Sequence, residues 1–211
     1  MKGQALETRH SKHHYFAEII DSSLVTWTAQ CWQWDTVPEF GSVVTIATKK
    51  RILFGIVYDI KTGSLEPGRY PFTYQKTEEE LLEEQPQIFE FLKTTFSCLT
   101  LGFQEHEIVY HQIAPEPPKI HAFVAPMTPE HYKQFFISTG YLHLLFASSG
   151  ICMVDELLLA LLRNFHKNNL LSEEKFAEFI DAIAQLSGND YRRLKLLIKR
   201  IPSYHRLPKQ S

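Results

Sequence analysis

The sequence predicts an α+β protein in which a small antiparallel β-barrel with an inserted helical segment is followed by a C-terminal helical region. Most segments rich in β-branched and aromatic residues lie before residue 127, separated by turn-forming clusters. Apolar residues in the last third recur at three- and four-residue spacings, which indicates amphipathic helices. Because the strands precede these helices instead of alternating with them, we expect α+β architecture and not βαβ units.

The 211-residue chain divides into three predicted regions. Residues 1–13 are polar and charged without periodicity, so we expect a flexible N-terminal arm. Residues 14–126 are expected to form the barrel domain, with the helical insertion at about 77–94. Residues 127–211 are expected to form the helical region, which ends in a basic last helix.

The clearest strand pair is a hairpin formed by Gly41–Ala47 and Ile52–Ile60, with a basic turn at 48–51. The following segment, Lys61–Tyr70, contains Gly63, Pro67 and Gly68, and we expect it to be a loop. Further strands are expected at Tyr15–Ile20, Leu24–Trp32, Phe96–Phe103, Glu107–Ile113 and Lys119–Ala125.

Capping signals place the helices. Thr77 and Glu80 have the spacing of a capping box, so we expect a helix to begin there. Pro86 favours the first turn of a second helix, which we expect to run to Thr94. The C-terminal helices are expected after Thr128, over Asp155–His166, from Ser172 to Gly188, and from a cap at Asn189 or Asp190 to Pro202.

Composition and local motifs argue against several functions. The chain has 22 basic and 24 acidic residues, too balanced for a body that binds polyanions over its whole surface. It contains no phosphate-binding loop, no dinucleotide GxGxxG and no GxSxG nucleophile elbow, so we lean against an enzyme and expect no cofactor. No secretory signal or bilayer-length apolar run is present, which favours a cytoplasmic protein without a membrane span.

The cysteines and histidines suggest little chemistry. Three scattered cysteines favour buried reduced thiols, and we expect the histidines at 10, 13 and 14 to be solvated. His106, His111 and His121 lie on or beside neighbouring predicted strands and are expected to be separately solvated or hydrogen-bonded; their convergence is the alternative. We interpret His131 and His143 as packing residues of an aromatic helix. No residue is therefore assigned a catalytic or metal-binding role.

Two charged helices are candidates for interaction. The glutamates of residues 78–84 form a solvated helix face, or an acidic docking surface. The candidate basic interaction surface of the last helix consists of Arg192, Arg193, Lys195, Lys199 and Arg200. A basic amphipathic helix binds nucleic acid, an acidic protein surface or an anionic membrane. Alternatively, it is an ordinary surface helix whose arginines pair with acidic residues elsewhere, including the 78–84 helix.

Four short segments carry a family resemblance. Residues 40–44 (FGSVV) and 53–60 (LFGIVYDI), continued by 84–92 (EQPQIFEFL) and 98–103 (CLTLGF), resemble the HAS-barrel. This small β-barrel is shared by rotary ATP synthase subunits and HerA-type DNA-translocating ATPases. The resemblance covers about Tyr15 to Phe103, or to Ala125 at its longest extent, and implies a role in ring assembly and partner docking. Because the ATPase motor is missing, ATP hydrolysis is not implied.

Three functions follow from these observations. The first is a non-catalytic assembly or docking protein, with a HerA-type ATPase or its nuclease as the protein partner that the resemblance implies, or with further copies of itself. The second is a nucleic-acid-binding accessory protein that uses the basic last helix. The third is an enzyme of unrecognised type, which requires His111 or His121 to lie in a concave pocket with other polar groups.

Overall fold

The computed structural model describes residues 14–66, 68, 72–148, 153–188 and 190–201. The expected N-terminal arm and Cys152 lie outside the described residues. Within them, a seven-stranded antiparallel sheet and a set of helices confirm the predicted α+β fold class.

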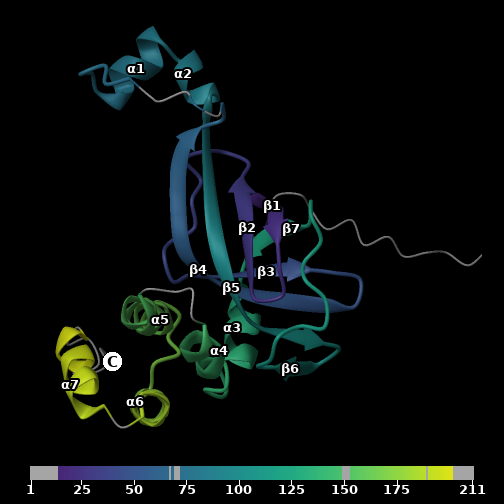
Figure 1. Cartoon of the computed structure of the whole chain (residues 1–211), viewed down its shortest axis with the longest axis vertical. Coiled ribbons are helices and arrows are strands. Elements are labelled where there is room, and N and C mark those ends of the chain that lie inside the picture. The colour runs from purple at the N-terminus through teal and green to yellow at the C-terminus, as the bar shows by residue number, and fades with distance from the viewer. Residues whose placement is uncertain (1–13, 67, 69–71, 149–152, 189, 202–211) are drawn as a thin grey trace, which may run out of the picture.

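Six of the strands close into a barrel (Figure 1). The hydrogen-bonded order is β2-β1-β7-β3-β4-β5, and pairing of β2 with β5 completes the ring. The bounds are β1 Ala17–Ser22, β2 Thr26–Cys31, β3 Val43–Ala47, β4 Arg51–Ser64, β5 Leu92–Glu105 and β7 Phe123–Pro126. The short β6, Ile108–Tyr110, pairs only with the end of β5. Within the barrel, closure gives each of the six strands a hydrogen-bonded neighbour on both sides, whereas beyond Val57 the only strand that pairs with β4 among the described residues is β5.

The long strands β4 and β5 are apolar on both faces because each face covers a core. Leu53 and Val57 of β4 point into the barrel, while Phe54 and Ile56 point outward against helices. Inside the barrel, Trp27 occupies the space over Gly55, where an added Cβ would lie 2.4 Å from its ring. The apolar run of residues 52–57 is therefore a strand buried on both sides.

Beyond the barrel, β4 and β5 continue as a two-stranded ribbon. The prediction of a loop over residues 61–70 was wrong at its start, because β4 runs to Ser64. The predicted helix to Thr94 was wrong at its end, because β5 begins at Leu92. The register pairs Ser64 with Leu92, and the Thr62 and Thr94 hydroxyls lie 2.7 Å apart. Cross-strand pairing thus overrides the local turn and helix signals.

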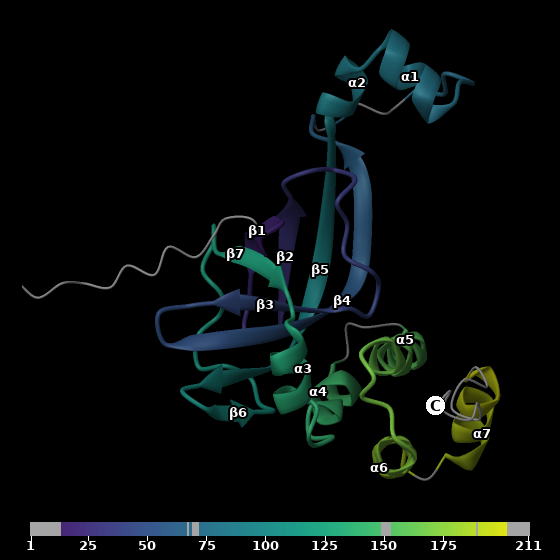
Figure 2. The same ribbon diagram turned by 180° about the vertical axis from the view of Figure 1, so that it is seen from behind.

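The helices have two locations. At the tip of the ribbon lie α1, Glu78–Glu84, and α2, Gln87–Glu90, far from the others (Figures 1 and 2). At the opposite end are α3 Pro129–Phe135, α4 Leu142–Ala147, α5 Val154–Lys167, α6 Glu173–Leu186 and α7 Tyr191–Arg200. Side chains of Thr77, Thr128, Ser172 and Asp190 cap α1, α3, α6 and α7. The first three caps are the predicted ones, and Asp190 is one of the two alternatives predicted for α7.

The C-terminal helices share one core with the outer wall of the barrel. Phe54 and Leu99 of the barrel pack with Phe135 of α3 and with side chains of the other C-terminal helices. Phe54 and Phe135 are in direct ring contact, with centroids 4.6 Å apart. The helical region is therefore packed against the barrel, and its position is set by apolar burial.

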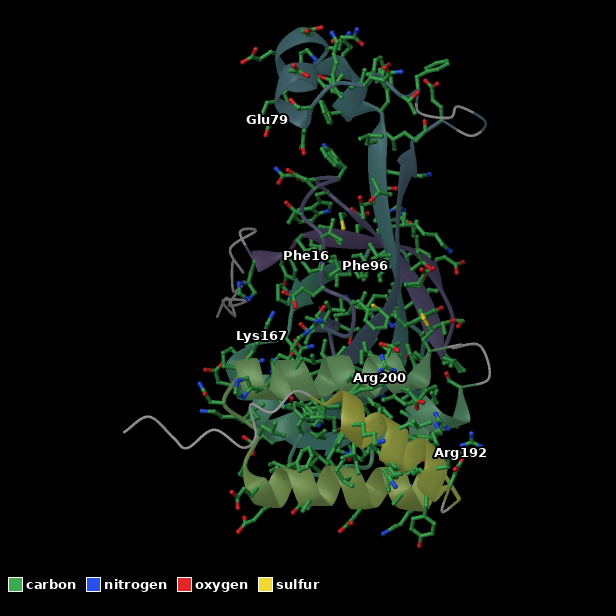
Figure 3. The ribbon with its side chains drawn as sticks, turned by 90° about the vertical axis from the view of Figure 1, so that its left-hand side faces the viewer. Phe16, Glu79, Phe96, Lys167, Arg192 and Arg200 are labelled. Atoms are coloured by element: carbon green, nitrogen blue, oxygen red, sulfur yellow. The ribbon has the colours of Figure 1, made fainter. Side chains whose placement is uncertain are left out.

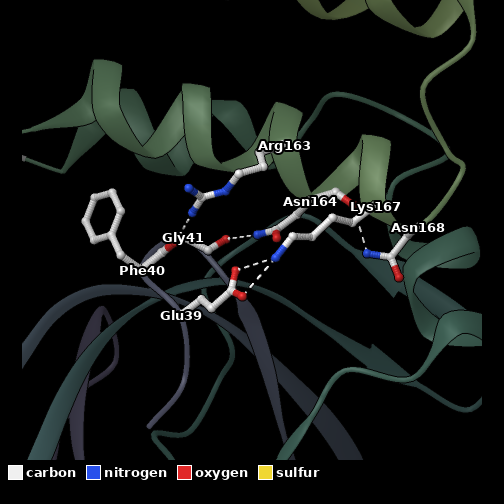
Figure 4. A network of polar contacts seen from close by, with 7 residues as sticks. All are labelled: Glu39, Phe40, Gly41, Arg163, Asn164, Lys167 and Asn168. Atoms are coloured by element: carbon white, nitrogen blue, oxygen red, sulfur yellow. Dashed lines mark hydrogen bonds and ion pairs between the residues drawn. The ribbon is translucent and has the colours of Figure 1, made fainter. Parts of the chain in front are cut away.

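A compact seam fastens α5 to the segment that enters β3 (Figure 4). The side-chain amide of Asn164, which is only 5% exposed, donates a 2.6 Å hydrogen bond to the Gly41 carbonyl. Lys167 donates to both carboxylate oxygens of Glu39 at 2.8 Å, and these hydrogen bonds lower the pKa of Glu39. A Cβ on Gly41 would lie 2.2 Å from that of Ala160. The close approach therefore requires glycine at position 41.

We predict that Gly41→Ala lowers the free energy of unfolding by about 2–4 kcal/mol. The substitution forces alanine into a positive φ of 75° and drives its methyl group into Ala160. Gly63→Ala is the matched control, because a Cβ there meets nothing within 4 Å. Urea denaturation of both variants measures the effect. Equal stability of the two would contradict the claim that the seam requires glycine at position 41.

Candidate interaction surface

Of the three strand histidines, His111 is a packing residue. Its Nε2–H donates to the Phe135 carbonyl at 2.8 Å, and its Nδ1 accepts from the Ser138 hydroxyl at 3.1 Å. Its ring stands edge-on to Phe135, with centroids 4.6 Å apart. Burial lowers the pKa of His111, so the neutral ring is favoured. These contacts give the side chain a structural role under α3.

The other two strand histidines occupy turns in different parts of the barrel. His121 contacts Glu18 at 2.5 Å, whereas His106 lines an open groove with the basic turn at Lys49 and Lys50. Within the described part of the chain, no cluster of His, Cys, Asp or Glu could hold a metal ion. The expectation of separate environments is confirmed for these three residues.

Two further expectations concern packing and thiols. His131 packs edge-on against Phe54, as expected, but His143 is exposed on α4, so the packing interpretation of His143 was wrong. Cys31 and Cys98 are buried and free, and burial raises the pKa of the Cys31 thiol to about 11. A thiol in that state is a poor nucleophile at neutral pH.

The inner face of α7 consists of Leu194, Leu197 and Ile201, which pack against the shared core. Arg193 and Arg200 flank this face and pair with the acidic first turn of α5. The Arg193 guanidinium donates to Asp155 from Nε at 3.0 Å and Nη2 at 2.6 Å, and that of Arg200 reaches Glu156 at 2.6 Å. The hydrogen bonds to Asp155 raise the pKa of Arg193. These two arginines fasten α7 to α5.

The outer face of α7 contains the other three residues of the predicted basic surface, Arg192, Lys195 and Lys199. All three are exposed, and none has an ion-pair partner among the described residues. Tyr191 and Leu196, which are 73% and 56% exposed, lie among them. Figure 3 places Arg192 and Arg200 on this helix, at the end of the molecule opposite Glu79. We call Tyr191, Arg192, Lys195, Leu196 and Lys199 the α7 outer face.

The tip of the ribbon is a second exposed surface. Neither α1 nor α2 has a buried residue. Between Ser64 and Leu92 the sequence has seven glutamates and two basic residues, Arg69 and Lys76, and Lys76 is paired with Glu84. Apolar side chains are exposed here too, with Phe72 at 78% and Leu82 at 49%. We call the segment 72–91 the acidic tip.

Sequence reasoning proposed pairing of the last-helix arginines with acidic residues, including the 78–84 helix. The pairing exists for Arg193 and Arg200, but their partners lie on α5, and α1 is at the far end of the molecule. Two apolar residues of the same helix, Tyr191 and Ile198, are exposed. The sequence did contain a signal for the true partners, namely the acidic residues in the first turn of α5.

Comparison with protein-family models and with curated proteins gives no match for this chain. Among the helices that the structure describes, none is both long and apolar enough to cross a lipid bilayer.

We predict that Arg193→Met and Arg192→Met separate the two roles of the helix. Arg193→Met removes the pairing with Asp155 and lowers the free energy of unfolding by roughly 1 kcal/mol, because this pair is part-exposed. Arg192→Met removes an unpaired charge and leaves the stability within about 0.5 kcal/mol of wild type. Thermal denaturation at one pH checks both; a larger loss for Arg192→Met would contradict the assignment.

Proposed function

We propose that this chain is a non-catalytic assembly protein: a barrel that presents docking surfaces to other proteins. The observation that carries the proposal is the α7 outer face, where unpaired cations and large apolar side chains lie together on a helix held firmly by its other side. Protein interfaces combine apolar contact area with charged groups that select the partner.

The interior of the barrel supports a scaffold role. It is filled by apolar side chains, among them Trp27, Phe96 and Phe103. The two described thiols are buried, and two of the strand histidines, His111 and His121, are engaged in separate contacts. A rigid, filled barrel positions surfaces without performing chemistry.

We also propose the class of protein that docks on this barrel. A closed antiparallel barrel is the architecture that the HAS-barrel resemblance implies, which supports a docking role beside a HerA-type ATPase or its nuclease. The charge of the α7 outer face favours a partner surface with exposed carboxylates.

Nucleic-acid binding is the second candidate. Arg192, Lys195 and Lys199 are free of ion pairs within the described chain and so are able to contact phosphates. The exposed Leu196 and Ile198 beside them fit a protein surface better, because apolar side chains gain nothing against a phosphate backbone.

A photo-crosslinking residue in place of Leu196 distinguishes the two candidates in intact cells. We predict adducts with protein, resistant to nuclease and sensitive to protease. The same residue in place of Leu24, exposed on the β1–β2 turn, is the control for nonspecific capture. Adducts from position 196 that disappear on nuclease treatment would establish nucleic-acid binding and overturn the docking proposal.

A further inference from the structure

The α7 outer face and the acidic tip are complementary surfaces on one chain. One face has three cations without an ion pair among the described residues, and they lie beside Tyr191 and Leu196. The other has glutamates beside Phe72 and Leu82, all exposed. Opposite charges steer association and fix orientation, while the apolar side chains supply contact area.

The two surfaces cannot meet within one molecule. In all three views of the whole chain, α1 lies at one end and α7 at the other, with the barrel between them (Figures 1–3). The β4–β5 ribbon is paired without a register shift from Asp59 and Ser97 to Ser64 and Leu92. The Thr94 hydroxyl donates to the carbonyl of Trp34 in the β2–β3 connection, and the Trp34 ring stacks on Phe89 of α2 with centroids 5.4 Å apart. These contacts tie the outer half of the ribbon and α2 to that connection. The tip is therefore held away from its own α7.

We infer that the occupant of the α7 outer face is the acidic tip of a second copy of this chain. This inference rests on the proposed assembly function and names the partner. The contact joins two different surfaces, so it is head-to-tail: each copy keeps a free tip and a free α7 face. Such contacts produce a ring when the rotation between copies closes and an open filament when it does not.

Two residue pairs provide a matched test. Glu79 and Glu83 are four residues apart on α1, and Lys195 and Lys199 are four apart on α7, so each pair lies on one helix face. All four are exposed and have no ion-pair partner among the described residues. Glu80 and Glu84 are excluded, because Glu80 forms the capping box and Glu84 pairs with Lys76. Reversal of the chosen charges therefore breaks no ion pair among the described residues, and it costs the fold the small helix-dipole contributions of Glu79 and Lys199, which lie in the first turn of α1 and the last turn of α7.

The experiment is sedimentation velocity of the purified full chain at low salt over a concentration series. Wild type is expected to self-associate, and high salt is expected to weaken the association. The Glu79→Lys/Glu83→Lys variant and the Lys195→Glu/Lys199→Glu variant are each expected to dissociate at roughly tenfold higher concentration or more. Lys49→Glu/Lys50→Glu, at the exposed β3–β4 turn, is the control for net charge and is expected to match wild type.

Mixing the two reversed variants is the decisive step. The basic tip of one then meets the acidic α7 of the other, and the acidic tip of the second meets the basic α7 of the first. Equimolar mixing is therefore expected to restore association to within about threefold of wild type. A chain that carries all four substitutions is expected to self-associate as well.

The inference is overturned if wild type stays monomeric, if the reversals change association no more than the Lys49/Lys50 control, or if mixing fails to restore it. Thermal denaturation of each variant verifies that its fold is retained. If self-association fails while position 196 still crosslinks a different protein, the assembly function stands and only the identity of the partner is wrong. If position 196 crosslinks nucleic acid alone, the assembly function itself fails.

Discussion

The close contact between Gly41 and α5 is the constraint on which the arrangement of the molecule depends. Only a glycine lets the chain entering β3 approach Ala160, and the buried Asn164 amide then satisfies the Gly41 carbonyl. This seam fixes α5 against the barrel. Because Arg193 and Arg200 of α7 pair with the first turn of α5, the position of the α7 outer face follows from the same contact.

The long β4–β5 ribbon is the second feature that determines the arrangement of the molecule. It belongs to the barrel at one end and holds α1 and α2 at the other. Helices that bury none of their residues gain little stability from their own chain, since isolated short helices are marginal in water. A capping box and an ion pair stabilise α1 locally, and a docking partner would add the missing burial. Together, the barrel, the seam and the ribbon keep the α7 outer face and the acidic tip apart.

Local signals in the sequence predicted where the capped helices begin. Long-range contacts decided where β4 ends and which basic residues of α7 are paired. The caps at Thr77, Thr128 and Ser172 are satisfied within three residues, so the sequence was sufficient. The end of β4 was missed because its partner, β5, lies about thirty residues further along the chain. The basic surface was predicted as one set of five, but only the packing of α7 on α5 separates its paired arginines from its free cations.

Energy transfer between labelled copies tests the central claim of two separate, complementary docking ends most directly. One copy would carry a donor at Gln87 beside the acidic tip, and another an acceptor at Gln185 on α6, both exposed and uncharged. Head-to-tail assembly predicts transfer between these unlike positions that rises with concentration and falls with salt. Transfer confined to copies labelled at the same position would indicate a symmetric contact and contradict the account, as would no transfer at all.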